Sequence, residues 1–288
     1  MKLLRTGLLL ILLSALLVLA GKAIAGARGM QIALGIAVVI NGISYFFSDR
    51  IALLSSGAQP VSREQLPRLY TVMERLAAKV NIPVPRLYVI PEAAPNAFAT
   101  GRNPRHASVA VTEGLLQLMN DEELEGVIAH ELSHVRNYDI LTSSIAATLA
   151  GAITYLASMG RWAMIFGGWG GSRDDDREGG GLAAILAIIL APLAALLLQL
   201  FLSRTREYAA DQTGARMVGH PYGLISALEK LGAYNKRIPT SVLAPATSAL
   251  CIVKPMFGRG TLSSLFSTHP PLEDRIATLR AMTVVPKR

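Results

Sequence analysis

Four long apolar runs without a charged residue constrain this chain more than any other feature of its sequence. They cover residues 6–21, 29–48, 140–160 and 179–203. A helix that crosses a bilayer needs about 20 mostly apolar residues; three runs meet this length and the first is slightly short. Charged residues make up only 17% of the chain, against about 25% in soluble domains. The sequence therefore indicates an integral membrane protein and argues against a disordered or an ordinary soluble chain.

The first apolar run has a second interpretation, as a cleaved signal peptide. Two basic residues precede it, and the small residues at 23–25 resemble a cleavage site. We prefer a retained helix, because the second run follows almost at once and predicts a helical hairpin. The last two runs have an alternative as buried core helices, although 182–202 has no polar side chain apart from Gln199.

These runs predict four parts along the chain. A first transmembrane hairpin covers 1–48 and a second covers 140–203, with its two spans at about 140–160 and 181–203. The polar parts, 49–139 and 204–288, are expected to fold together as one head above the membrane bundle. The single cysteine, Cys251, excludes an internal disulfide and a cysteine-rich zinc site.

Charge asymmetry predicts the orientation of the chain in the membrane. The loop 161–178 has three basic and four acidic residues and is the only net-acidic short loop. By the positive-inside rule this loop lies outside, and both polar parts and both termini lie in the cytoplasm. Lys22 and Arg28 in the first hairpin loop oppose this assignment. The last part has twelve basic and five acidic residues; this surplus fits attraction to anionic lipid and lacks any nucleic-acid motif.

Hydrophobic periodicity and turn residues predict the secondary structure of the polar parts. A turn is expected at 91–95. The expected strands are 86–90, 96–100 and 107–112, and the expected helices are 60–80, 113–119, 121–136 and 204–217.

The sequence HELSH at 130–134 is the strongest chemical motif. His130 and His134 are four residues apart in a predicted helix, so they share one face and both imidazoles can reach one tetrahedral Zn²⁺ ion. Glu131 is offset around the helix, where it can take a proton from an activated water and pass it to a leaving amine. The residues thus predict a catalytic metal site with Glu131 as general base.

A third metal ligand must come from elsewhere in the chain. No histidine follows His134 before the next apolar run, which excludes a metzincin. Glu207 and Asp211 are four residues apart on a later helix: Glu207 can bind the metal, and Asp211 can accept the N–H of a ligand imidazole. The alternative is that both carboxylates only pair with neighbouring arginines, namely Arg204, Arg206 and Arg216.

With these residues in place, the chain resembles the HtpX-type membrane zinc metallopeptidases, relatives of the CAAX prenyl proteases. The matching stretches are 95–101 (PNAFATG), HELSH with 137–139, 203–211, and 268–276 with its THPP sequence. The resemblance implies one zinc ion bound by His130, His134 and Glu207, with Glu131 as the catalytic base. It covers nearly the whole chain and is weakest over 238–266.

Further residues have weaker assignments. Asn96 is a candidate for binding substrate backbone, with a turn-forming role as the alternative. His269 is a candidate for stabilising an oxyanion or touching the metal, with packing as the alternative. Arg275 is expected to anchor its segment through a salt bridge. The strand 107–111 is either a sheet edge that pairs with extended substrate or an ordinary core strand.

The sequence therefore predicts an α-rich α+β protein with a four-helix transmembrane part and a zincin-like (gluzincin) metallopeptidase head. Its expected function is zinc-dependent cleavage of misfolded or membrane-associated proteins at the cytoplasmic face of a bacterial inner membrane. One alternative is a narrow CAAX-type processing peptidase. The other is a zinc-stabilised membrane adaptor without turnover, in which Glu131 would have no use. Co²⁺ or Ni²⁺ could occupy the same ligands.

Overall fold

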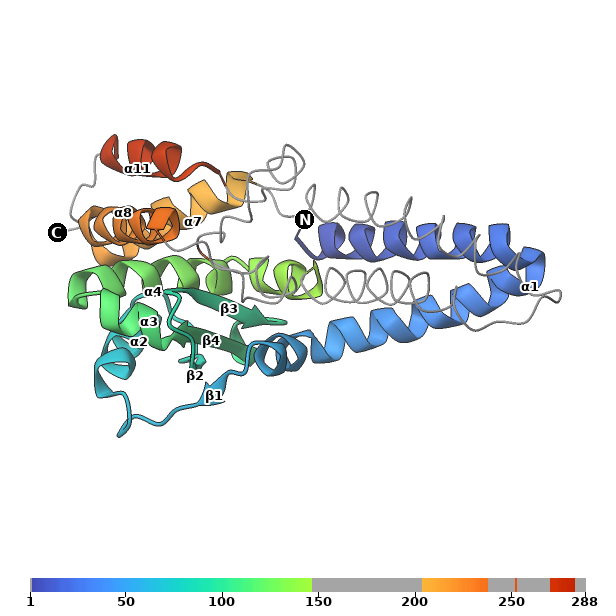
Figure 1. The fold of residues 1–288 in the computed structure, drawn as a ribbon, viewed down its shortest axis with the longest axis horizontal. Coiled ribbons are helices and arrows are strands. Elements are labelled where there is room, and N and C mark those ends of the chain that lie inside the picture. The colour runs from blue at the N-terminus through green and yellow to red at the C-terminus, as the bar shows by residue number, and fades with distance from the viewer. Residues whose placement is uncertain (1, 147–203, 238–251, 253–269, 283–288) are drawn as a thin grey trace.

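The computed structural model describes residues 2–146, 204–237, 252 and 270–282 of the chain. A long helical hairpin extends from a head that contains one β-sheet and several shorter helices (Figure 1). The expected mixed and helix-rich character of the head is confirmed in these residues. Of the predicted spans at 140–160 and 181–203, only residues 140–146 are among the described residues, and these are helical.

Helix α1 (Lys2–Ser55) is a hairpin of two arms that meet at Ala25 and Gly26, where the backbone leaves the helical conformation. The arms Thr6–Ala23 and Ala25–Ser55 are each long and apolar enough to cross a membrane. The arms pack closely at the bend, because a Cβ atom at Gly21 would lie 2.4 Å from the carbonyl oxygen of Gly29. A helical hairpin is therefore present, and its second arm continues beyond the predicted end at residue 48.

Polar side chains tie the arms of α1 to each other and to the helix that follows the head. Asn41 donates a hydrogen bond of 2.8 Å to Ser14 across the hairpin. Thr6 and Thr142 share a buried hydrogen bond of 2.7 Å between their hydroxyls. Such interhelical hydrogen bonds stabilise helix association where no water competes.

The sheet has four strands in the order β1-β2-β4-β3. Their bounds are β1 (Gln59–Pro60), β2 (Arg86–Ile90), β3 (Ala97–Gly101) and β4 (Ala107–Thr112). Strand β4 runs parallel to β2 and antiparallel to β3, so it lies inside the sheet. Of the two alternatives for 107–111, the structure therefore has the core strand and not the sheet edge, and all six residues of β4 are buried.

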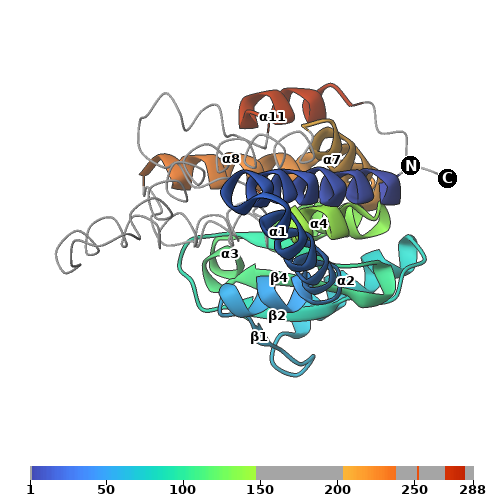
Figure 2. The same cartoon turned by 90° about the vertical axis from the view of Figure 1, so that its right-hand side faces the viewer.

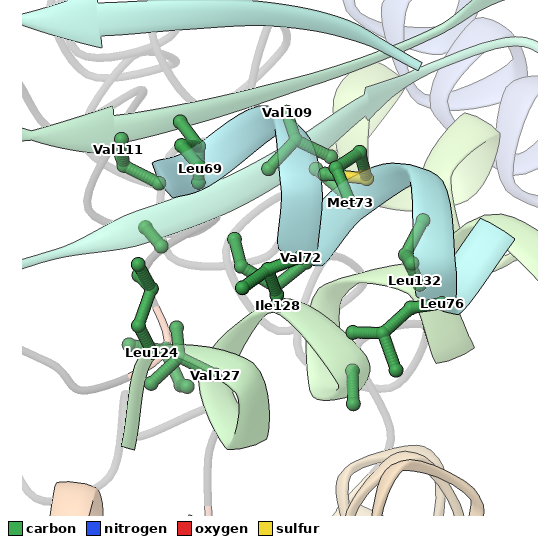
Figure 3. Close-up of a cluster of buried hydrophobic side chains, with 14 of the residues drawn as sticks. Leu69, Val72, Met73, Leu76, Val109, Val111, Leu124, Val127, Ile128 and Leu132 are labelled. Carbon is green, nitrogen blue, oxygen red and sulfur yellow. The ribbon is translucent and has the colours of Figure 1, made fainter. Parts of the chain in front are cut away.

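Two layers cover the sheet. On one face, Val109 and Val111 of β4 contact apolar side chains of α2 (Pro67–Lys79) and α4 (Asp121–Arg136), as Figure 3 shows. On the other face, Ala110 and Phe98 pack against Ala52 and Leu53 at the end of α1. The period of two in β4 thus places alternate side chains in two different cores.

The predicted helix 60–80 begins later than expected. Helix α2 starts at Pro67, a residue that is well suited to the first turn of a helix because its missing N–H is not needed there. Pro60 belongs instead to the short strand β1, which pairs with β2. The prediction failed here because the apolar spacing continued upstream without showing the strand pairing.

The remaining helices stack above α4 on the side away from the sheet (Figures 1 and 2). They are α7 (Arg204–Val218), α8 (Tyr222–Arg237) and α11 (Leu272–Arg280). The short helix α3 (Glu113–Leu118) connects β4 to α4. Helix α4 has the bounds that the sequence predicted. It lies between the sheet and α7, and this position explains why 11 of its 16 residues are buried.

Glu123 joins the start of α4 to α8. Its carboxylate accepts hydrogen bonds from the Asn120 backbone N–H (2.9 Å), the Ser226 hydroxyl (2.6 Å) and the Lys230 ammonium (2.7 Å). The Asn120 side chain in turn accepts from the Glu123 backbone N–H, which completes a capping box. Although burial opposes ionisation, Lys230 and Ser226 hold the pKa of Glu123 below its usual value.

We expect Glu123→Gln to lower the free energy of unfolding of the detergent-solubilised protein by about 1–3 kcal/mol, because the amide leaves at least one of three donors without its charged acceptor. Since the folded-state pKa of Glu123 is lowered, the difference from the native protein should be full above about pH 4.5 and shrink as the pH falls through the folded-state pKa. Thermal unfolding at several pH values measures it. The neighbouring, exposed Glu122→Gln should change stability by less than about 0.5 kcal/mol; equal losses would contradict this role of Glu123.

Candidate metal centre

The two histidines of the HELSH motif lie in the second half of α4. Asn120 caps this helix and three acidic residues occupy its first turn, where they favour helix formation. The spacing of four residues brings Nε2 of His130 within 3.2 Å of Nε2 of His134. The rings stand nearly perpendicular, at 87°, with centroids 4.8 Å apart. The predicted pairing of the imidazoles on one helix face is therefore confirmed.

Glu207 reaches the histidine pair from α7. One carboxylate oxygen lies 3.6 Å from Nε2 of His130, and the other lies 3.7 Å from Nε2 of His134. One donor atom from each residue falls within 4.8 Å of the others. The structure thus brings together the three residues that the sequence proposed as ligands.

This donor set fits a zinc ion. Tetrahedral ligands at about 2.0–2.1 Å from zinc lie about 3.3 Å from one another. The two imidazole nitrogens are 3.2 Å apart, and they lie 3.6 and 3.7 Å from different oxygens of the Glu207 carboxylate. Two imidazoles and one carboxylate are also a known set for catalytic zinc, which keeps a fourth position for water or substrate. The three side chains therefore match zinc in the type of their donor atoms and in their spacing.

Asp211 and Arg275 form a buried support behind His130. Asp211 Oδ1 lies 2.9 Å from Nδ1 of His130, on the ring edge opposite the metal-binding nitrogen. Arg275, from α11, donates two hydrogen bonds to Asp211, of 2.8 and 2.6 Å. Arg275 itself is fully buried. This pair orients the imidazole and fixes which ring nitrogen carries the proton.

The charges of this support are mutually dependent. Although burial opposes ionisation of both groups, Arg275 holds the pKa of Asp211 below its usual value, and Asp211 raises the pKa of Arg275. The expected salt bridge of Arg275 is therefore present, and its partner is Asp211. The alternative pairing of Asp211 with arginines of its own helix is not what the structure has.

Glu131 is buried beside the histidine pair. Its carboxylate accepts a hydrogen bond from the backbone N–H of Ala99 in β3. Burial raises the pKa of the Glu131 carboxyl above its usual value, although the neighbouring imidazoles and the Ala99 amide act in the opposite direction. A carboxylate with a raised pKa in a buried site suits proton transfer near neutral pH.

Asp139 lies behind the second histidine. Its carboxylate is 3.7 Å from Nδ1 of His134, which is an ion-pair distance and too long for a hydrogen bond. Arg206 of α7 approaches the same carboxylate at 3.9 Å. Although burial opposes protonation, Asp139, Glu207 and Glu131 together raise the pKa of His134 to about 9. Asp139 thus matches, for His134, the position of Asp211 beside His130.

Asn96 is not free to bind substrate through its side-chain oxygen. That oxygen accepts from the backbone N–H groups of Ala97 (2.8 Å) and Ile252 (3.3 Å). Ile252 also donates to the Ala97 carbonyl oxygen and accepts from Arg275 Nη1 at 2.9 Å. Asn96 therefore links the start of β3 to Ile252. This is a structural role, and it is closer to the predicted turn-forming alternative than to substrate binding.

The other candidate residues have different outcomes. His269 lies outside the described residues. His106 is exposed and bonds to Asn103, and His220 lies at the other end of the head near Glu122. Neither of these two histidines is paired with a metal ligand.

Sequence reasoning missed two contributors to the site. Asp139 follows HELSH by five residues, and its proximity to His134 depends on the turn that ends α4. Gly214 lies on the same face of α7 as Glu207 and Asp211, seven residues after the first and three after the second. A Cβ atom there would lie 3.0 Å from the His130 backbone nitrogen, so this glycine permits the close approach of α7 to α4.

Sequence comparisons connect this chain to known peptidases. A sequence model of peptidase family M48 matches residues 63–283. A protein named Protease HtpX homolog from Syntrophobacter fumaroxidans is 51% identical over 278 residues, which cover 96% of this chain and 98% of that protein. The protein of the same name from Desulfatibacillum aliphaticivorans is 54% identical over 94% of this chain and 86% of its own length. The one from Pyrococcus furiosus is 51% identical over 97% of this chain and 96% of its own length.

A solved structure shares the fold. The crystal structure of S. mikatae Ste24p aligns with a TM-score of 0.50 at 20% sequence identity and covers 95% of this chain. The chain spans 62% of the length of that protein. At this level of identity the likeness concerns the fold alone.

We expect Gly214→Val to lower the amount of metal retained by the purified protein, because the added side chain pushes α7 away from His130 and carries Glu207 with it. Retained zinc per chain, counted by elemental analysis, should fall well below that of the native protein. Ala209→Val places the same side chain on an exposed part of α7 and should leave zinc content unchanged. Equal zinc content in both variants would contradict the role assigned to Gly214.

Asp211→Asn should weaken metal affinity by about 10–100-fold, because the amide loses the charge that orients His130 and compensates Arg275. Competition with a chromophoric chelator measures the affinity, and circular dichroism shows whether the variant is folded. The exposed Asp274→Asn on α11 is the matched control and should bind metal like the native protein. An unchanged affinity in folded Asp211→Asn would show that this carboxylate does not support the ligand.

Proposed function

Because the chain belongs to peptidase family M48 and is a membrane metalloprotease, we propose that His130, His134 and Glu207 bind its catalytic zinc ion and that Glu131 is the general base. The family expected from the sequence motifs is confirmed by these relatives. One observation carries the assignment of residues: the donor atoms of the three ligands converge within 4.8 Å, and Glu131 is buried next to them.

Zinc is the proposed metal because two imidazoles and one carboxylate leave one tetrahedral position open. When bound, zinc polarises the scissile carbonyl and lowers the pKa of an attacking water to about 7. Co²⁺ and Ni²⁺ also bind such nitrogen and oxygen donors, so metal content is part of the test below.

Glu131 moves the proton. As a carboxylate it takes the proton of the attacking water, and as the acid it passes that proton to the nitrogen of the leaving amine. Burial raises the pKa of the Glu131 carboxyl, which favours its acting as the proton donor in the second step. The Ala99 N–H fixes the direction of the carboxylate.

The supporting carboxylates orient the ligands. Asp211, held by Arg275, accepts the Nδ1–H of His130, so that Nε2 faces the metal. Asp139 attracts Nδ1 of His134 in the same sense. With both Nε2 atoms directed toward Glu207, the ligands need little rearrangement to bind the ion.

The site is proposed to lie close to the cytoplasmic membrane surface. The third apolar run begins six residues after His134, and the fourth ends four residues before Glu207. Four spans and a cytoplasmic head, as the charge asymmetry predicts, place the scissile bond of a substrate near the bilayer. Misfolded or membrane-associated proteins in a bacterial inner membrane are therefore the proposed substrates, and cleavage restricted to soluble peptides would contradict this.

We expect Glu131→Gln to reduce cleavage of an unfolded membrane-protein substrate in detergent by about 10²–10⁴-fold, because the amide cannot accept the proton. The variant should keep about one zinc per chain, since Glu131 is not a ligand. Gel-based cleavage and elemental analysis of the same samples measure both quantities.

Two controls complete this experiment. A chelator should abolish cleavage by the native protein and added zinc should restore it, while Glu122→Gln on the exposed side of α4 should cleave normally. Undiminished cleavage by Glu131→Gln would overturn its role as general base. Bound zinc with no cleavage by either form would favour the non-catalytic adaptor or a narrower processing specificity.

A further inference from the structure

A second pocket lies where the end of α1 meets the sheet, and the zinc chemistry does not involve it. Its volume is about 560 Å³. Four arginines line it: Arg50 follows the apolar part of α1, Arg86 begins β2, and Arg102 and Arg105 lie in the connection from β3 to β4. Three separate segments of the chain therefore bring cationic side chains to one cavity.

Among the described residues, acidic side chains do not balance the positive charges of this pocket. Asp49 is the only acidic residue that lines it within the described part of the chain, and it approaches Arg86 at 3.7 Å. Arg50 lies over the ring of Phe47, 5.9 Å from its centroid. In the described ranges, Arg50, Arg102 and Arg105 make no salt bridge. Four guanidinium groups beside one carboxylate leave an excess of positive charge, which an anion would stabilise.

The pocket lies at the level of the membrane boundary. Residues 29–48 of α1 carry no charge, and a helix of 20 residues spans about 30 Å, the thickness of the hydrocarbon core. Asp49 and Arg50 are the first charges beyond this stretch. Phe46 and Phe47 line the same pocket and are 57% and 46% exposed, so their apolar rings are open to contact with acyl chains.

The connection from β3 to β4 lies at the same end of the sheet as the end of α1. The connection from β3 to β4 and the end of α1 lie on the side of the sheet that faces the helical hairpin (Figure 1). A ligand in this pocket would therefore contact both the membrane helix and the sheet. Arg102 directly follows β3, the strand whose Ala99 backbone N–H bonds Glu131.

We propose that this pocket binds the phosphate-bearing headgroup of an anionic membrane phospholipid. Planar guanidinium groups match phosphate oxygens through paired hydrogen bonds. The exposed phenylalanines lie on the membrane side, where the acyl chains would run. Basic pockets beside transmembrane helices at the cytoplasmic surface attract anionic lipids for the same electrostatic reason. The inference rests on insertion of α1 in the membrane and is independent of the zinc site.

The test uses the full chain in detergent, titrated with phosphatidylglycerol or with phosphatidylcholine of the same acyl chains and followed by native mass spectrometry. Phosphatidylglycerol should bind more tightly than phosphatidylcholine. Arg102→Gln/Arg105→Gln should weaken phosphatidylglycerol binding by about 25-fold, since each arginine near a membrane surface contributes a factor of about five. Arg102→Lys/Arg105→Lys, which keeps the charge, should lose much less.

Arg63→Gln/Arg216→Gln is the matched control, because it removes two exposed arginines of the head that do not line the pocket. It should bind phosphatidylglycerol like the native protein. Equal binding of both lipids, or equal losses in the control and pocket variants, would overturn the proposal. Inorganic phosphate that binds as tightly as the lipid would identify a site for free anions instead. If the double glutamine variant does not fold, Arg105→Gln alone provides the comparison, since this side chain is exposed.

Discussion

The close contact between α4 and α7 is the constraint on which the metal centre depends. His130 and His134 come from one helix and Glu207 from the other, and the chain between them includes two long apolar runs. Gly214 allows the backbones to approach, because a Cβ atom there would lie 3.0 Å from the His130 nitrogen. The spacing of the three donor atoms follows from this helix contact, since the side chains reach only a few ångströms from their helices.

Behind this contact lies a chain of buried polar groups that extends from α11 to the ligand. Arg275 holds Asp211, and Asp211 holds His130. Burying such charges is costly, and a buried ion pair often stabilises a protein no more than apolar packing would. Its value here lies in orientation: the arginine fixes the carboxylate, and the carboxylate fixes the ring. The same arginine donates to the Ile252 carbonyl oxygen, and Ile252 bonds to the start of β3 through Ala97.

The sequence predictions were accurate where local interactions determine the structure and failed where contacts between distant segments determine it. The bounds of α4, β2 and β4 were predicted correctly, because caps, turns and local periodicity determine them. The start of α2 was wrong, since Pro60 pairs with β2 and this pairing leaves no local signal. The sequence left open whether 107–111 is an edge or a core strand, because alternation shows that a strand has two distinct faces and does not show which strands lie beside it. The structure places β4 between β2 and β3.

By itself, the sequence determined the chemistry of this protein: the histidine pair at helical spacing, the base between them, the later glutamate and the apolar hairpin. Each of these depends on residue types and short spacings, which local geometry converts directly into a shared helix face or a membrane span. Only the tertiary structure decided that Arg275 faces Asp211, that Asp139 lies behind His134, and that four arginines from three segments line one pocket. These arrangements depend on how distant elements pack, and such packing is set by the whole core at once.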